Sequence, residues 1–118
     1  MSRTRWQRKA PDFNWTQGDT APAIAEQLFD GTGTAVNLSG ATVKFQMAGP
    51  GQATAEVDAT ATITDAALGK VSYTPITADT DTIGVYMVQW KVTFGGGAIE
   101  RFPNSDYQKI KIQKQVAP

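Results

Sequence analysis

Short segments of alternating apolar and polar residues cover most of this sequence, and they constrain its fold more than any other feature. In the clearest one, residues 85–94, the side chains of Tyr86, Val88 and Trp90 share one face and Gln89 lies on the other. A period of two residues is the side-chain repeat of a β-strand with one buried face. The other expected strands are residues 24–29, 36–38, 41–48, 61–64, 70–74, 98–102 and 107–113.

Glycine, proline, aspartate and asparagine separate these segments, as in the Gly95-Gly96-Gly97 triplet. That triplet predicts a tight hairpin, because glycine tolerates the positive φ that such a loop needs. Only residues 65–69 and 76–83 suggest helical turns. Many short strands with regularly spaced turns are typical of an all-β domain, and we expect an antiparallel β-sandwich of seven to eight strands.

Residues 81–88 favour an immunoglobulin-like form of this sandwich. Gly84 and Tyr86 resemble the tyrosine corner of such domains, in which the tyrosine hydroxyl bonds back to the upstream backbone and opens the penultimate strand. The residues two and four positions after that tyrosine are then expected in the core. The expected core includes Phe45, Tyr73, Val88, Trp90 and Val92.

The 118 residues contain no histidine and no cysteine, which removes the side chains of most catalytic and transition-metal sites. Asp65, Asp79 and Asp81 offer too few oxygens for calcium, which takes roughly six to eight. We therefore expect no enzymatic activity, no cofactor and no metal. No apolar run reaches the roughly 20 residues that cross a bilayer, so no membrane contact is expected either.

Charge is unevenly distributed, although the net charge is zero. Residues 1–9 carry four basic side chains and residues 109–114 carry three, and neither segment contains an acid. Residues 10–108 hold four basic residues and all 11 acidic ones, a balance of −7. Such an acidic body repels nucleic acid, so any polyanion contact is expected at the two ends.

Residues 1–17 lack the alternation of the rest and are predicted to form an extended N-terminal arm, followed by a sandwich domain over 18–114 and a short tail over 115–118. Tryptophan and arginine are enriched at the centres of protein interfaces, which favours docking of the arm to a partner protein. An idle tail and a nucleic-acid contact through stacking and phosphate pairing are the alternatives. The expected partner-binding residues are Arg3, Arg5, Trp6, Arg8, Lys9, Phe13 and Trp15.

A family resemblance adds to this interpretation. The stretches that carry it are GDTAPAI at 18–24, VNLSGATVKF at 36–45, ALGKVSY at 67–73, TDTIGVY at 80–86 and FPN at 102–104. Over residues 18–112 the sequence resembles the amino-terminal domain of phage baseplate upper proteins. The resemblance implies an immunoglobulin-like sandwich that serves as a non-enzymatic part of a virion near the tail tip.

These features predict a structural protein of a phage virion. We expect a tail or baseplate adaptor or attachment subunit that docks through its arm to other virion proteins, in several symmetric copies and without a small-molecule substrate. In that family the domain is followed by further regions, whereas this chain stops at Pro118, which favours a free-standing adaptor. Capsid decoration or a head-to-tail subunit is the alternative within this class. A small nucleic-acid-binding module that uses both basic ends is the alternative of another class.

Overall fold

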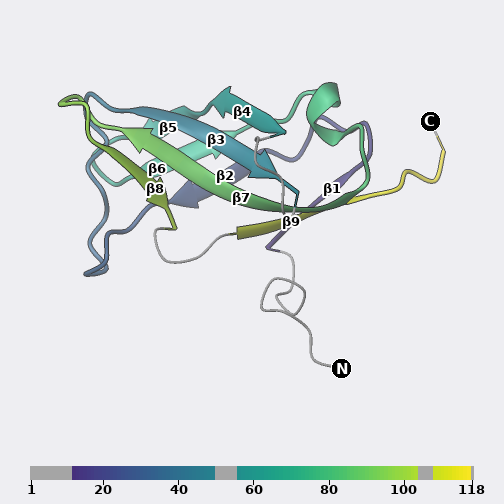
Figure 1. Ribbon diagram of the computed structural model, residues 1–118, viewed down its shortest axis with the longest axis horizontal. Coiled ribbons are helices and arrows are strands. Elements are labelled where there is room, and N and C mark those ends of the chain that lie inside the picture. Colours follow the sequence, from purple (N-terminus) through teal and green to yellow (C-terminus); the bar gives the residue numbers. More distant parts are fainter. Residues whose placement is uncertain (1–11, 50–55, 104–107, 118) are drawn as a thin grey trace.

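Two β-sheets pack face to face in the computed structural model, which describes residues 12–49, 56–103 and 108–117 (Figure 1). The all-β sandwich predicted from the sequence is confirmed. The described residues form the strands β1 Phe13–Thr16, β2 Ile24–Gln27, β3 Thr42–Ala48, β4 Val57–Thr60, β5 Thr62–Asp65, β6 Lys70–Tyr73, β7 Gly84–Thr93, β8 Ile99–Phe102 and β9 Gln108–Gln113, and a 3-10 helix, η1, over Thr77–Thr80.

The larger sheet is built around β7, its longest strand. Its order is β1-β9-β7-β3-β4, and β8 also pairs with β7. β3 runs antiparallel along one side of β7, while β9 pairs with residues 84–88 and β8 with residues 90–93 on the other side. β7 is therefore paired along almost its whole length, and its inward side chains lie at the centre of the sandwich.

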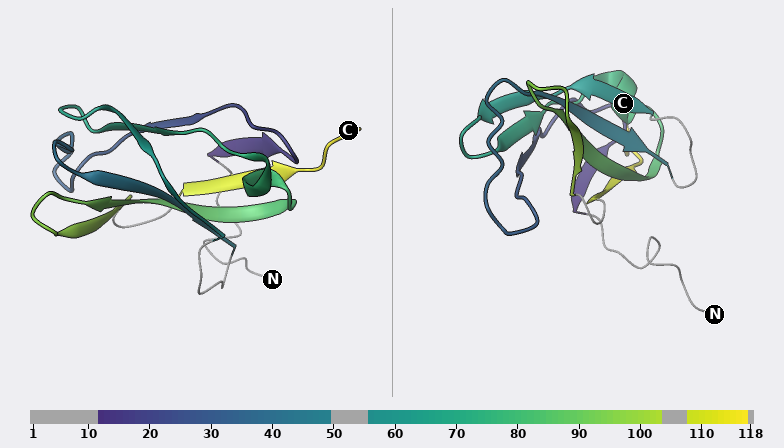
Figure 2. Two further views of the ribbon diagram at one scale, coloured as in Figure 1. Left: turned by 90° about the horizontal axis from the view of Figure 1, so that it is seen from above. Right: turned by 60° about the vertical axis from the view of Figure 1, so that its left-hand side comes forward.

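The smaller sheet has the order β2-β6-β5, with both pairs antiparallel. It covers the inner face of the larger sheet, as the two views in Figure 2 show. The turn at residues 66–69 and helix η1 are the places where the sequence suggested helical turns. None of the described helical segments is long and apolar enough to span a bilayer.

The core is centred on Phe45 of β3. Its ring stacks on Tyr73 of β6 with the centroids 4.4 Å apart, and it meets the Trp90 ring edge-on at 5.2 Å. Val88, Trp90 and the third predicted inward residue of β7, Val92, are fully buried. The predicted face of β7 and its two aromatic companions are confirmed.

The predicted tyrosine corner is also present at the start of β7. The Tyr86 hydroxyl donates a 2.8 Å hydrogen bond to the carbonyl oxygen of Thr82, four residues upstream. This bond joins the end of the η1 connection to the strand that follows it. It supports the immunoglobulin-like form of the sandwich.

The predicted limit of the N-terminal arm is wrong. Residues 13–16 form β1, which pairs in parallel with β9, and the side chain of Trp15 is only 2% exposed. Its indole N–H donates a 2.9 Å hydrogen bond to the carbonyl oxygen of Pro22. Phe13 and Trp15 in fact alternate with polar residues, but four residues are too short a run to stand out after a basic segment. The described domain therefore begins at Asp12 and not at residue 18.

Two further segments differ from the prediction. Residues 36–38 form no strand, although the side chains of Val36 and Leu38 point into the core and are buried. β4 was not expected, because Val57 is its one large apolar residue. As an edge strand, it needs only one inward anchor to pair with β3.

Candidate functional site

The structure divides the expected docking residues into two groups. Arg3, Arg5, Trp6, Arg8 and Lys9 lie outside the described residues, and their docking role stays a prediction. Phe13 is half-buried and packs against the core, and Trp15 belongs to the core itself. Because Trp15 is buried within the domain, its assignment as a partner-binding residue is corrected, whereas the partner-binding role of Phe13 stays a prediction.

Asp12, the first described residue after the basic segment, is hydrogen-bonded to the start of β9. The Asp12 N–H donates to the Lys109 carbonyl oxygen at 2.8 Å, and the Lys109 N–H donates to the Asp12 carboxylate, also at 2.8 Å. Residues 1–11 therefore join the domain beside the start of β9. Any docking by this segment begins from that point on the surface.

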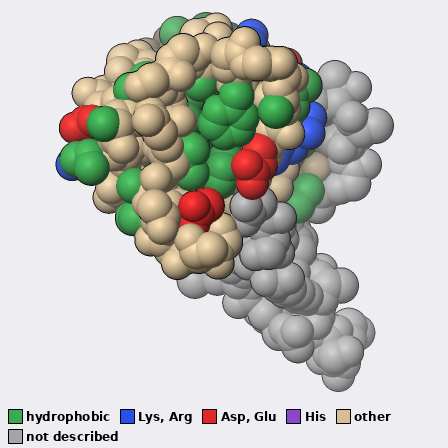
Figure 3. All heavy atoms as spheres, turned by 90° about the vertical axis from the view of Figure 1, so that its left-hand side faces the viewer, with side chains coloured by type: hydrophobic (Ala, Val, Ile, Leu, Met, Phe, Trp, Pro, Cys, Tyr) green, Lys and Arg blue, Asp and Glu red, His purple; other side chains and the backbone are tan. Residues whose placement is uncertain are grey.

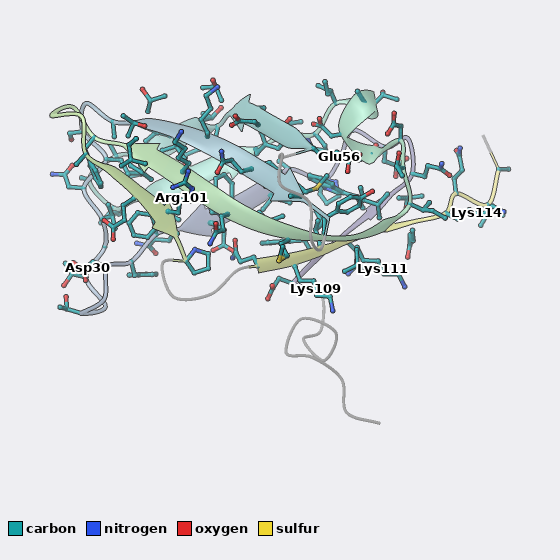
Figure 4. All side chains as sticks on the ribbon, viewed as in Figure 1. Asp30, Glu56, Arg101, Lys109, Lys111 and Lys114 are labelled. Carbon is teal, nitrogen blue, oxygen red and sulfur yellow. The ribbon has the colours of Figure 1, made fainter. Side chains whose placement is uncertain are left out.

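The described lysines near the C-terminus extend away from Asp12, the residue at which the N-terminal segment joins the domain. Because β1 and β9 are parallel, Asp12 lies at Lys109, whereas Lys114 lies beyond the opposite end of the pair. Figure 4 shows Lys109, Lys111 and Lys114 spread along β9 and the segment after it. Lys109, whose backbone is hydrogen-bonded to Asp12, is only 7% exposed. These three lysines therefore give a polyanion no single basic surface.

A pocket of about 170 Å³ opens between β2 and the facing ends of β8 and β9. Figure 3, which views the molecule from the left-hand side of Figure 1, shows hydrophobic side chains gathered in a hollow with acidic side chains beside it. The pocket combines a carboxylate and two amides with aromatic and aliphatic walls. Its lining residues are Glu26, Gln27, Leu28, Phe29, Trp90, Phe102, Pro103 and Gln108.

A chain of hydrogen bonds orients the polar groups of this pocket. The Trp90 indole N–H donates to Oε1 of Gln108 at 3.1 Å, and Nε2 of Gln108 donates to the Glu26 carboxylate. The indole can only donate, so it fixes which end of the Gln108 amide faces Glu26. The carboxylate of the small sheet is thereby joined to β9 of the large sheet.

The Glu26 carboxyl has a raised pKa. Burial is the largest cause, since it removes water from the charged form, and the nearby charge of Asp12 raises the pKa further. The hydrogen bond from Gln108 opposes this shift. Glu26 thus has a carboxylate whose negative charge is poorly solvated and lies close to a second acid.

Sequence reasoning missed this pocket, although one signal was available. Glu26 shares the inward face of β2 with Ile24, which is buried, because the two are two positions apart in the strand. An acidic residue at an inward strand position marks a polar group that needs a partner. Its partner Gln108 is 82 positions away and could not be identified from spacing.

The aspartates considered for a calcium ion are used within the fold. The Asp79 carboxylate accepts hydrogen bonds from the Tyr73 hydroxyl at 2.5 Å and from the Ile76 N–H at 3.0 Å. Burial of Tyr73, followed by this bond, raises the pKa of its hydroxyl. The Asp65 carboxylate accepts from the N–H of Leu68 in the adjacent turn. In the part of the chain that the structure describes, no group of three or more acidic, histidine or cysteine side chains is placed to hold a metal ion.

Comparisons with known proteins identify similar folds. No protein-family model matches the sequence, and no curated protein is significantly similar to it. The N-terminal domain of phage TP901-1 ORF48 has a similar structure, with a TM-score of 0.59 at 16% identity over 87% of this chain and 83% of that one. CopC from Methylosinus trichosporium OB3b is also similar, with a TM-score of 0.51 at 12% identity over 95% of this chain and 92% of that one. At these identities the likenesses show a shared fold.

Proposed function

We propose that this chain is a non-enzymatic structural protein of a phage virion. Specifically, it is a tail or baseplate adaptor or attachment subunit that docks to other virion proteins and is present in several symmetric copies. The observation that carries this proposal is the fold shared with a phage protein domain, the N-terminal domain of TP901-1 ORF48, over 87% of this chain. The sequence motifs that resemble baseplate upper proteins fall within the same domain and support the same class.

The docking element in this proposal is now residues 1–11. It retains Trp6 and all four basic residues of the N-terminal segment, while β1 and its aromatic residues belong to the domain. Arginine and tryptophan supply much of the binding energy at protein interfaces, and an acidic partner surface would complement the positive charge. The hydrogen-bonded pair of Asp12 and Lys109 gives this segment a fixed point of attachment.

The polar groups of the pocket support a non-enzymatic role. Gln108 does not titrate, and it engages the Glu26 carboxylate. Covalent catalysis needs a nucleophile held next to a base, and the sequence offers neither histidine nor cysteine for such a pair. The arrangement suits holding a group in place better than transferring one.

Deletion of residues 2–10 tests the proposal, because it removes the basic segment and leaves Asp12 and β1 intact. The shortened protein is expected to fold and to be missing from purified particles. A variant without residues 115–118 serves as the control, since Val116 is fully exposed, and it should be incorporated normally. Full incorporation of the protein that lacks residues 2–10 would contradict docking through this segment.

The position of the protein in intact particles separates the two virion roles. Cryo-electron microscopy of particles should show it at the tail or baseplate, whereas a position on the capsid surface would favour decoration. A salt-dependent affinity of the purified protein for DNA, lost on deletion of residues 2–10, would instead favour the nucleic-acid alternative.

A further inference from the structure

We propose that the pocket beside Gln108 receives the guanidinium group of Arg8 from the same chain, so that the free protein holds its basic N-terminal segment against its own sandwich. This inference rests on the proposed function only for its purpose, which is to keep the docking segment occupied before assembly. The binding itself is a property of the isolated protein and is tested there.

The pocket has the chemistry that a cation requires. Within residues 12–49, 56–103 and 108–117, the groups that shift the pKa of the Glu26 carboxyl are Gln108, Asp12 and the backbone of Gln27. None of these groups carries a positive charge. A half-buried carboxylate gains most from a positive charge that can share its poorly solvated site.

The walls of the pocket favour a guanidinium over a small ammonium ion. The ring of Phe29 is 48% exposed at the mouth, and Phe102 and Trp90 form deeper walls. A guanidinium is planar, is more weakly hydrated than an ammonium, and both stacks on aromatic rings and pairs with a carboxylate. These properties match a hollow that combines aromatic surface with one acid.

The attachment of the basic segment brings it to this pocket. Going backwards along β1, the register with β9 ends at Asp12 opposite Lys109, and the next residue of β9, Gln108, lines the pocket. Arg8 is four residues before Asp12, a reach of up to about 13 Å of extended chain before its own side chain is added. Such a short tether gives the segment an effective concentration on the order of millimolar at the pocket, which favours its own chain over a second copy.

Self-binding would lower the apparent affinity of the segment for other proteins. Only the fraction of molecules with a released segment can dock, so a partner must bind it more tightly than the pocket does. Premature association of free subunits through residues 1–11 would be reduced in the same proportion.

Limited digestion with trypsin tests the inference on the full chain. The initial rate of cleavage after Arg8, followed by mass spectrometry, is compared between the wild type, Glu26→Gln and Asp58→Asn. Glu26→Gln keeps an acceptor for Gln108 but removes the charge, and we expect cleavage about threefold faster, as for the loss of one partly exposed ion pair. Asp58→Asn makes the same change of net charge on β4, away from the pocket, and should be cleaved at the wild-type rate.

Two further measurements complete the test. Phe29→Ala, which removes an exposed wall of the pocket without changing charge, should also accelerate cleavage, and it provides the answer if Glu26→Gln does not fold. The wild-type rate per molecule should be constant over about a hundredfold range of protein concentration, because the contact is within one chain.

Equal cleavage rates in the wild type and the pocket variants would overturn the inference. Protection that grows with protein concentration would also overturn it, because it would place the segment in the pocket of a second copy. Neither result would affect docking in particles, which the incorporation experiment measures separately.

Discussion

The ring centroids of Trp15 and Phe45 lie 6.2 Å apart, with an angle of 50° between the two ring planes. Trp15 belongs to β1 at the edge of the large sheet, and Phe45 belongs to β3, with β9 and β7 between them in the sheet order. The contact links the first described strand to the centre of the core. The N-terminal part of the domain is therefore part of its packing.

Replacement of Trp15 by alanine is expected to destabilise the protein by about 3–5 kcal/mol, because it removes a buried aromatic side chain and leaves a cavity. Urea unfolding followed by circular dichroism measures the loss. Deletion of residues 2–10 is the matched comparison and should change the free energy of unfolding little. If Trp15→Ala unfolds at the wild-type midpoint, the placement of β1 in the sandwich is wrong.

Replacement of Tyr86 by phenylalanine should cost about 1 kcal/mol. The ring remains, while the carbonyl oxygen of Thr82 loses its 2.8 Å hydrogen bond from the hydroxyl. The same unfolding assay reports the change, and Tyr86→Leu should cost more because it also removes packing. Identical stability of the phenylalanine variant and the wild type would show that the corner bond contributes nothing.

Gly69→Ala is expected to be strongly destabilising, by roughly 1–3 kcal/mol. Gly69 has φ +67°, and an added Cβ would lie 2.7 Å from the carbonyl oxygen of Val36 and 2.8 Å from that of Leu28. Both obstacles are backbone atoms, which cannot rotate away. Gly31→Ala is the control, since a Cβ there meets nothing within 4 Å, and its melting temperature should stay close to that of the wild type. Similar melting temperatures for the two variants would contradict the close packing around Gly69.

The pH dependence of stability should show the raised pKa of Glu26. The folded state holds the proton of Glu26 more tightly than the unfolded state, in which the carboxyl has its ordinary pKa of about 4.5. The free energy of unfolding therefore falls as the pH rises from 4.5 through the pKa of Glu26 in the folded state. Above that pKa the full destabilisation by the charged carboxylate is present. Because Glu26→Gln removes this destabilisation, we expect it to raise the stability at neutral pH when residues 2–10 are deleted from both the variant and its reference, so that Arg8 cannot pair with Glu26.

Chemical unfolding of both proteins between pH 4 and pH 7 checks this expectation. The stability difference should shrink as the pH falls toward 4.5, while groups such as Asp30, whose pKa is lowered by its hydrogen bonds, affect both proteins alike. A difference that is constant across this range would show that Glu26 titrates equally in the folded and unfolded states.

The parts of the fold that could be predicted from the sequence are those with a strong local pattern. The inward face of β7 follows from four apolar residues at alternate positions, and the corner at Tyr86 follows from a short motif. β1 has only two apolar residues, and its partner β9 lies almost 100 positions away, so no local pattern could pair them. β4 was missed for the same reason, because its place in the sheet depends on β3 more than on its own side chains.

The candidate site was less accessible still. Glu26, Trp90 and Gln108 come from three strands, and only Trp90 was identified, as a core residue. The proximity of Asp12 to Glu26 depends on the parallel pairing of β1 with β9, which no spacing in the sequence reveals. Pockets assembled across two sheets need the tertiary structure before their chemistry can be interpreted.

The parallel pairing of β1 and β9 also has a mechanical consequence. The chain enters the pair at Asp12 and leaves it at Gln113, at opposite ends of the two strands. A force that pulls the two ends of the domain apart would slide the strands past each other. Their backbone hydrogen bonds, from Asp12 to Lys109 through to Gln17 and Gln113, would then carry the load together instead of opening one after another. A subunit held at both ends under tension would resist rupture through this strand pair.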